Sequence, residues 1–79
     1  MNTTKLSLRD IANATEQDWK NVSPYARPYL DAMKELSSAS DSYFADSGSS
    51  VVMYFLANAA SYRGENARAY KAQLKAMVK

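Results

Sequence analysis

The sequence predicts an all-α protein, a small helical bundle with three main helices and a short helical N-terminal arm, forming one domain over residues 1–79. Two observations lead to this fold class. An apolar segment over 50–62 is bounded by residues that begin and end helices, and residues 65–79 repeat apolar side chains with helical spacing. A chain of this length buries only about 60–65% of its unfolded surface, so we expect a thin core.

The central segment holds the longest run of apolar side chains, over 51–57. Residues 46–50 offer several N-cap oxygens before it, and Gly64 after it suits the left-handed residue that follows many helices. We therefore expect a helix over about 47–62. Because this helix would be apolar on every side, it should be surrounded by the others or share an exposed stripe with a partner. It is too short for a bilayer, which needs roughly 20 residues, so no membrane partner is expected.

The N-terminal arm contains two candidate capping boxes. Ser7 with Asp10, and Thr15 with Asp18, each place a hydroxyl and a carboxylate three residues apart. Two boxes in such close succession indicate two short turns and not one longer helix. We expect these turns at about 7–13 and 15–21.

Two further helices follow from caps and spacing. Ser23 and Pro24 suit the cap and first residue of a helix, but Pro28 disfavours helical angles at the residue before it. The second helix should therefore start at about 24 or about 28 and continue to about 44. Its serine-rich middle, over 37–40, is a poor helix former whose small side chains would let the central helix approach closely. The last helix, over about 65–78, is the most regular in the chain.

Helical spacing selects a core of twelve side chains, among which Trp19 should anchor the N-terminal arm on the rest of the molecule. All of them are apolar or aromatic. They are Ile11, Trp19, Leu30, Met33, Leu36, Val52, Phe55, Leu56, Ala59, Tyr70, Leu74 and Met77.

The composition argues against enzymatic and metal chemistry. The chain has no cysteine and no histidine, and with two glycines it has no Gly-rich phosphate loop. We therefore expect a protein that is not an enzyme and that has no catalytic residue, cofactor or metal site. Without disulfides or zinc, a partner or homo-oligomerisation is the remaining way to stabilise a thin core. No basic-then-apolar leader follows Met1, which favours a cytoplasmic location.

The net charge of +2 is unevenly distributed. Residues 1–48 hold five basic and seven acidic groups, whereas 49–79 hold five basic groups and one acid, Glu65. Four basic residues follow one another along one face of the last helix, and they are Arg68, Lys71, Lys75 and Lys79. Two interpretations stay open: this face is an ordinary solvated surface, or it contacts the phosphates of a nucleic acid.

The turn before the last helix is the candidate recognition site. Six tyrosines in so short a chain suit either the rim of a thin core or a protein-binding surface, where tyrosine and arginine are enriched. A tight corner would present an aromatic ring, a guanidinium and a carboxylate together. The candidate partner-binding residues are Tyr62, Arg63, Glu65, Arg68, Lys71 and Lys75. In the alternative interpretation, Tyr62 closes the core and Arg63 bonds to carbonyls at the end of the central helix.

Two stretches, 24–33 (PYARPYLDAM) and 50–59 (SVVMYFLANA) with its continuation in 63–68 and 71–75, resemble small uncharacterised proteins of tailed phages and prophages. The resemblance covers about residues 7–78. It implies a class of small accessory proteins that bind and block or redirect host machinery, including anti-CRISPR and other counter-defence proteins.

Many inhibitors of this class are acidic and imitate DNA, whereas this chain is mildly basic. The expected function is therefore that of a phage-type accessory protein in the host cytoplasm. It would bind and inhibit or modulate a host protein, such as a bacterial CRISPR-Cas component. The alternative is a small nucleic-acid-binding protein that uses the basic C-terminal helix.

Overall fold

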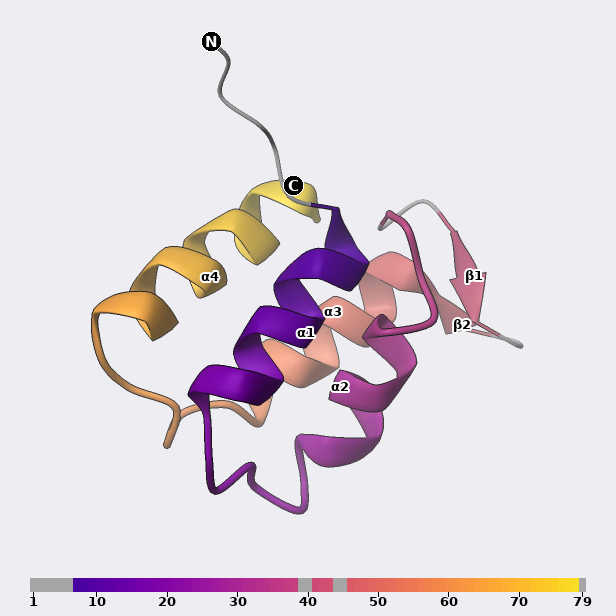
Figure 1. Cartoon of the computed structure of the whole chain (residues 1–79). Coiled ribbons are helices and arrows are strands. Elements are labelled where there is room, and N and C mark those ends of the chain that lie inside the picture. The colour runs from indigo at the N-terminus through magenta and orange to yellow at the C-terminus, as the bar shows by residue number, and fades with distance from the viewer. Residues whose placement is uncertain (1–6, 39–40, 44–45, 79) are drawn as a thin grey trace, which may run out of the picture.

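The structure, a computed structural model, describes residues 7–38, 41–43 and 46–78. It confirms the all-α class, because helices make up most of this described part (Figure 1). They are α1 (Leu8–Asp18), α2 (Arg27–Met33), α3 (Gly48–Ala57) and α4 (Glu65–Met77). Between α2 and α3, the two-residue strands β1 (Ser42–Tyr43) and β2 (Asp46–Ser47) pair antiparallel, with Ser42 opposite Ser47.

The four helices close around one hydrophobic core. Both α1 and α3 contact α2 and α4, and α1 lies in front of α3 in Figure 1. Nine of the twelve predicted core residues are buried: Ile11, Trp19, Leu30, Met33, Leu36, Val52, Phe55, Ala59 and Leu74. The other three predicted core residues, Leu56, Tyr70 and Met77, are partly buried and pack against this core.

Helical spacing missed seven buried apolar residues, four of which are alanines. Alanine is common on exposed helix faces as well, so its position in the sequence says little about burial. In the fold, these small side chains let neighbouring helices pack closely. The seven are Leu8, Ala12, Ala26, Ala32, Val51, Tyr62 and Ala67.

α1 is one continuous helix, so the two separate turns predicted over 7–13 and 15–21 are wrong. The first capping box is confirmed, because Ser7 Oγ accepts from the Asp10 N–H at 3.1 Å and Asp10 Oδ2 accepts from the Ser7 N–H at 3.4 Å. Thr15 is not a cap, since it is buried within the helix. Burial of one apolar face outweighs the capping tendency of a single threonine. This face consists of Leu8, Ile11, Ala12 and Thr15.

α2 ends at Met33, well before the predicted end near residue 44, which lies outside the described residues. Asp41 Oδ2 accepts hydrogen bonds from the backbone N–H groups of Ser37 and Ser38, at 2.9 and 3.2 Å. This side chain competes with the carbonyls to which a continuing helix would bond. The Ser37 carbonyl in turn accepts from the Leu8 N–H at 3.1 Å, which joins the turn to the start of α1.

The start of α2 agrees with the later of the two predicted positions. The helix begins at Arg27, one residue before Pro28. Ahead of it, Ser23 Oγ accepts from the Tyr25 N–H at 3.2 Å, and the Ser23 carbonyl accepts from the Ala26 N–H at 3.0 Å. Ser23 therefore caps a separate turn and not the helix itself.

α3 begins as predicted but ends early. Ser47 is its N-cap, with Oγ accepting from the Ser50 N–H at 3.1 Å. The helix ends at Ala57 and not near residue 62, because Asn58 Nδ2 donates to the Tyr54 carbonyl at 2.8 Å. In a continuing helix this carbonyl would accept the Asn58 backbone N–H. Among the described residues, no helix is long and apolar enough to cross a membrane.

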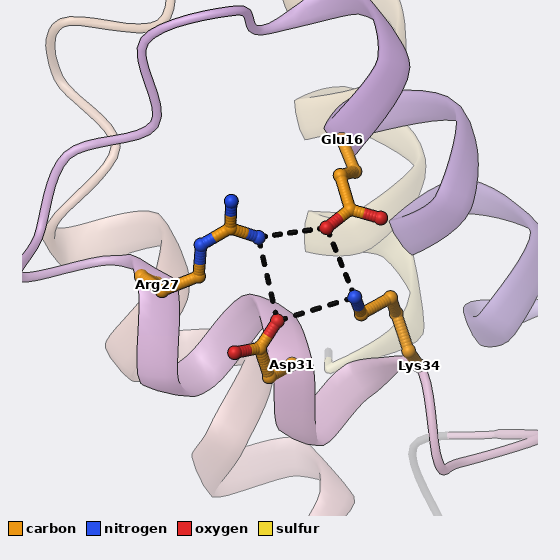
Figure 2. A network of polar contacts seen from close by, with 4 residues as sticks. All are labelled: Glu16, Arg27, Asp31 and Lys34. Carbon is orange, nitrogen blue, oxygen red and sulfur yellow. Dashed lines mark hydrogen bonds and ion pairs between the residues drawn. The ribbon is translucent and has the colours of Figure 1, made fainter.

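A ring of four charged side chains joins α1 to α2 (Figure 2). Arg27 Nη1 lies 2.7 Å from Glu16 Oε2 and 3.4 Å from Asp31 Oδ1. Lys34 Nζ lies 2.9 and 3.2 Å from the same two oxygens, so each acid contacts both bases. We call Glu16, Arg27, Asp31 and Lys34 the charged ring. All four side chains are partly exposed, so their contribution to stability is small.

Candidate functional site

Four of the six predicted partner-binding residues come together at the connection between α3 and α4, at the lower left of Figure 1. There the surface forms a shallow hollow of about 330 Å³. The hollow is lined by Tyr62, Arg63, Gly64, Ala67, Arg68 and Lys71. We call these six residues the basic corner.

Gly64 sets the direction of the chain at the basic corner. Its φ of 120° lies in a region that residues with a side chain rarely adopt. The sequence predicted that Gly64 directly follows the central helix. This is wrong, because α3 ends at Ala57 and Gly64 is the N-cap of α4. Its carbonyl accepts from the Arg68 N–H at 3.0 Å, and α4 (Glu65–Met77) agrees with the predicted 65–78.

Tyr62 forms the base of the basic corner and closes the core, as one of the two interpretations of the sequence proposed. Only 2% of its surface is exposed, and its ring stacks on Trp19 with centroids 5.0 Å apart. Its hydroxyl donates to Asp18 Oδ2 at 2.7 Å. Burial raises the pKa of Tyr62, and the Asp18 carboxylate raises it further, so the phenol stays neutral and acts as a donor.

Lys71 is held against the same tyrosine. Its Nζ donates to the Tyr62 carbonyl at 2.6 Å and lies 5.7 Å from the centroid of the Tyr62 ring. Burial lowers the pKa of Lys71, and the positive charges of Lys75 and Arg63 lower it further. The ammonium group therefore lies near other positive charges, with the Tyr62 carbonyl as its hydrogen-bond acceptor and no ion pair to a carboxylate among the described residues.

The other predicted site residues are exposed at or beside the basic corner. The side chains of Arg63 and Arg68 line the hollow, and neither side chain makes a hydrogen bond or ion pair with another described residue. The alternative interpretation proposed that Arg63 bonds to carbonyls at the end of the central helix. Within the described part of the chain, the structure shows no such bond from the Arg63 side chain. Lys75 and Glu65 lie outside the lining, although the charge of Lys75 acts on Lys71.

Asp18 supports the corner from α1 and was not among the predicted site residues. Besides the Tyr62 hydroxyl, its carboxylate accepts from Asn66 Nδ2 at 3.1 Å. The hydrogen bond from Asn66, and then that from Tyr62, lowers the pKa of Asp18. Both partners lie more than forty positions after Asp18 in the sequence. Only the capping pattern drew attention to Asp18, and that pattern indicated a different role.

Among the described residues, three large apolar side chains outside the predicted site are exposed. Tyr25, Met53 and Tyr54 are each more than half exposed, and the Tyr29 ring lies 5.4 Å from the Tyr54 ring. Tyr25 precedes α2, Tyr29 lies on α2, and Met53 and Tyr54 lie on α3. The sequence left open whether the tyrosines form the rim of the core or a protein-binding surface, because helical spacing identifies an apolar residue and not whether a neighbour covers it.

The chemistry available to the basic corner is the recognition of negative charge. Its three cations are suited to binding carboxylate or phosphate groups. Among the described residues, no group of three or more cysteine, histidine or acidic side chains is placed to hold a metal ion. Comparison with protein-family models, with curated proteins and with solved structures gives no match for this chain.

Proposed function

We propose that this chain is a phage-type accessory protein that binds and inhibits or modulates a host protein without catalysing a reaction. The basic corner is its binding surface. One observation carries the proposal: Arg63, Arg68 and Lys71 line one hollow, and no carboxylate of the described chain pairs with them. Clustered like charges oppose folding unless something compensates them, so an acidic partner is the natural complement.

The rigidity of the corner supports the same proposal. Tyr62 is fixed by Trp19 and Asp18, and Lys71 is fixed by the Tyr62 carbonyl. Side chains that are ordered before binding lose less conformational entropy when a partner arrives. Arg63 and Arg68 are exposed and unbonded within the described chain, so they are available to pair with carboxylates of the partner.

Nucleic-acid binding is the second candidate function, and the position of Lys75 favours it. Lys75 lies one helical turn beyond Lys71 and is close enough to lower the pKa of Lys71. Together with Arg68, these residues extend positive charge along α4. Such a line of charge suits a phosphate backbone, whose binding weakens steeply as salt is added.

Affinity capture from bacterial lysate, including CRISPR-Cas components, tests the leading proposal. The wild-type chain is compared with Arg63→Ala, which removes a corner charge, and Arg68→Glu, which reverses one; neither arginine side chain has a hydrogen bond or ion pair in the described fold. We expect either change to weaken the captured complex more than about tenfold, equivalent to about 1.4 kcal/mol, while the melting temperature changes by only a few degrees.

Arg9→Ala is the matched control for loss of a positive charge. Arg9 lies in the first turn of α1, roughly 15 Å along the helix from Trp19, and it contacts the Lys34 carbonyl. This variant should bind the partner as the wild type does. If Arg63→Ala and Arg68→Glu bind as well as Arg9→Ala, the assignment of the basic corner is wrong.

Nuclease treatment of the captured sample separates the two candidate functions. A protein partner should stay bound after nuclease, and binding should depend on the corner arginines. If the captured species is nucleic acid, and Lys75→Glu weakens it as much as Arg68→Glu, the second candidate replaces the first. Binding of duplex or single-stranded DNA at about 50 mM salt then measures its strength directly.

A further inference from the structure

Three cationic side chains line the shallow hollow at the basic corner. Arg63 comes from the connection before α4, whereas Arg68 and Lys71 come from its first two turns. We propose that this hollow binds a single phosphate monoester group carried by the partner protein, such as a phosphorylated serine, threonine or tyrosine. This inference rests on the proposed function, because it names the chemical group through which the partner is held.

Charge is the first argument for a phosphate monoester. Three cations line the hollow, and no described carboxylate pairs with them. A phosphate monoester carries about −1.5 to −2 charges near pH 7, whereas a carboxylate or a backbone phosphodiester carries one. The monoester therefore compensates more of the positive charge at a single point. The two guanidinium groups can each present two parallel N–H donors to its oxygens.

The lining of the hollow is the second argument. Gly64 and Ala67 contribute almost no side-chain bulk, and a Cβ added at Gly64 would meet nothing within 4 Å. An anion can therefore approach the backbone at this corner. Lys71 is already held in place by the Tyr62 carbonyl, while the two arginines make no competing contact within the described chain.

The effect of the cations on one another is the third argument. Burial, and then the positive charges of Lys75 and Arg63, disfavour the charged form of Lys71 in the absence of a ligand. A dianion in the hollow would reverse this effect by attracting all of these charges. Binding should therefore raise the pKa of Lys71 and stabilise the fold, in proportion to the occupancy of the site.

Nuclear magnetic resonance of the ¹⁵N-labelled chain tests the site with inorganic phosphate as the probe. Three titrations, with phosphate, acetate and dimethyl phosphate, are run at about pH 7.5 and constant ionic strength, where a phosphate monoester is mainly dianionic. We expect saturable shifts at the amides of 62–71 with phosphate, at a Kd on the order of 1–10 mM. The two monoanions should bind at least about fivefold more weakly. Absence of saturable phosphate shifts, or equal binding of acetate, would overturn the proposal.

Matched variants assign the phosphate-dependent shifts to the hollow. Arg63→Gln and Arg68→Gln should each weaken phosphate binding about fivefold or more, and Arg68→Lys should have a smaller effect because it keeps the charge but loses the fork. Arg9→Gln should bind phosphate as the wild type does. Both arginines are exposed, and the spectrum of each variant will show whether it is folded. If phosphate binding survives both substitutions, the hollow is not the site.

Phosphatase treatment of the captured partner connects the hollow to a protein-borne phosphate. We expect the treatment to weaken capture about tenfold or more for the wild type, and to have little further effect on Arg68→Gln. If capture depends on the corner arginines but not on phosphatase, the phosphate inference fails and the proposed function stands. If the free chain binds phosphate but capture of the partner does not depend on the corner arginines, the proposed function fails. The inference that the phosphate is carried by a partner protein then fails as well. If nuclease abolishes capture and phosphatase does not, the ligand is a nucleic-acid phosphodiester and the inference of a phosphate monoester is wrong.

Discussion

The charged ring between α1 and α2 and the basic corner between α3 and α4 use positive charge in opposite ways. In the ring, Arg27 and Lys34 each contact both Glu16 and Asp31, at 2.7 to 3.4 Å (Figure 2). In the corner, three cations line one hollow without an acidic partner in the described chain. The charges of the ring are paired within the fold, whereas the cations of the corner form no ion pair with a described carboxylate.

Two lysines show the difference most clearly. Hydrogen bonds from Lys34 to Glu16 and then Asp31 raise the pKa of Lys34, so the fold favours its charged form. Burial and the charges of Lys75 and Arg63 lower the pKa of Lys71, so the fold disfavours its charged form. A group whose charge is disfavoured without a ligand is a stronger candidate for function than one whose charge is already paired. The comparison therefore supports the proposal that the corner, and not the ring, is the binding surface.

The largest expected effect comes from removing the aromatic support of the corner. Trp19→Ala deletes a buried ring that stacks on Tyr62 and meets Phe55 edge-on at 6.2 Å. We expect it to reduce the free energy of unfolding by about 3–5 kcal/mol, as measured by urea denaturation. A loss below about 1 kcal/mol would mean that the corner does not rest on the core as described.

A smaller effect is expected from Tyr62→Phe, which removes only the hydroxyl that bonds to Asp18. The variant should lose about 1 kcal/mol of stability at neutral pH. This hydrogen bond, together with that from Asn66, holds the pKa of Asp18 below its ordinary 3.8. Stability from a lowered carboxyl pKa is present above 3.8 and is lost as pH falls through the folded value. The difference in melting temperature between wild type and variant should therefore shrink in acid, and a constant difference would contradict the assignment.

Breaking the charged ring should cost less. Glu16→Gln removes the acid that contacts both Arg27 and Lys34, but all of these side chains are partly exposed. We expect the melting temperature to fall by a few degrees in low salt, and by less in about 1 M salt, where exposed ion pairs are screened. Thermal unfolding at the two salt concentrations measures this. A large fall that salt does not change would show that Glu16 matters for packing and not for charge.

The smallest effect, and the opposite sign, is expected at the corner. Arg63→Gln removes one of the charges that disfavour charged Lys71, so the melting temperature should rise slightly in low salt. High salt should remove this gain, as it removes the loss caused by Glu16→Gln. If Arg63→Gln instead destabilises the fold in a salt-dependent way, the arginine has a compensating partner within the protein, and the contrast between the two surfaces is lost.

The sequence alone determined the fold class and the beginnings of three helices. Ser7 with Asp10, and Ser47 with its serine-rich continuation, are local capping signals, and the structure contains both caps. The regular spacing over 65–78 likewise determined α4 within about a residue. A cap involves backbone groups within three residues of one another, so no distant part of the chain is needed to predict it. The same local spacing identified nine core residues that are buried.

Tertiary contacts decided how far α1 continues and what surrounds the candidate site. Thr15 has the pattern of a cap, yet burial of its helix face carries α1 through it. The ends of α2 and α3 are different, because Asp41 and Asn58 form local hydrogen bonds to backbone groups four residues away, and apolar spacing gives no information about such bonds. At the site, the sequence named the charged residues, but Asp18 and Trp19 reach Tyr62 only because α1 packs against α4. Whether a charge is paired depends on the distance between elements that are far apart in the chain. For that reason the fold alone separates the charged ring from the basic corner.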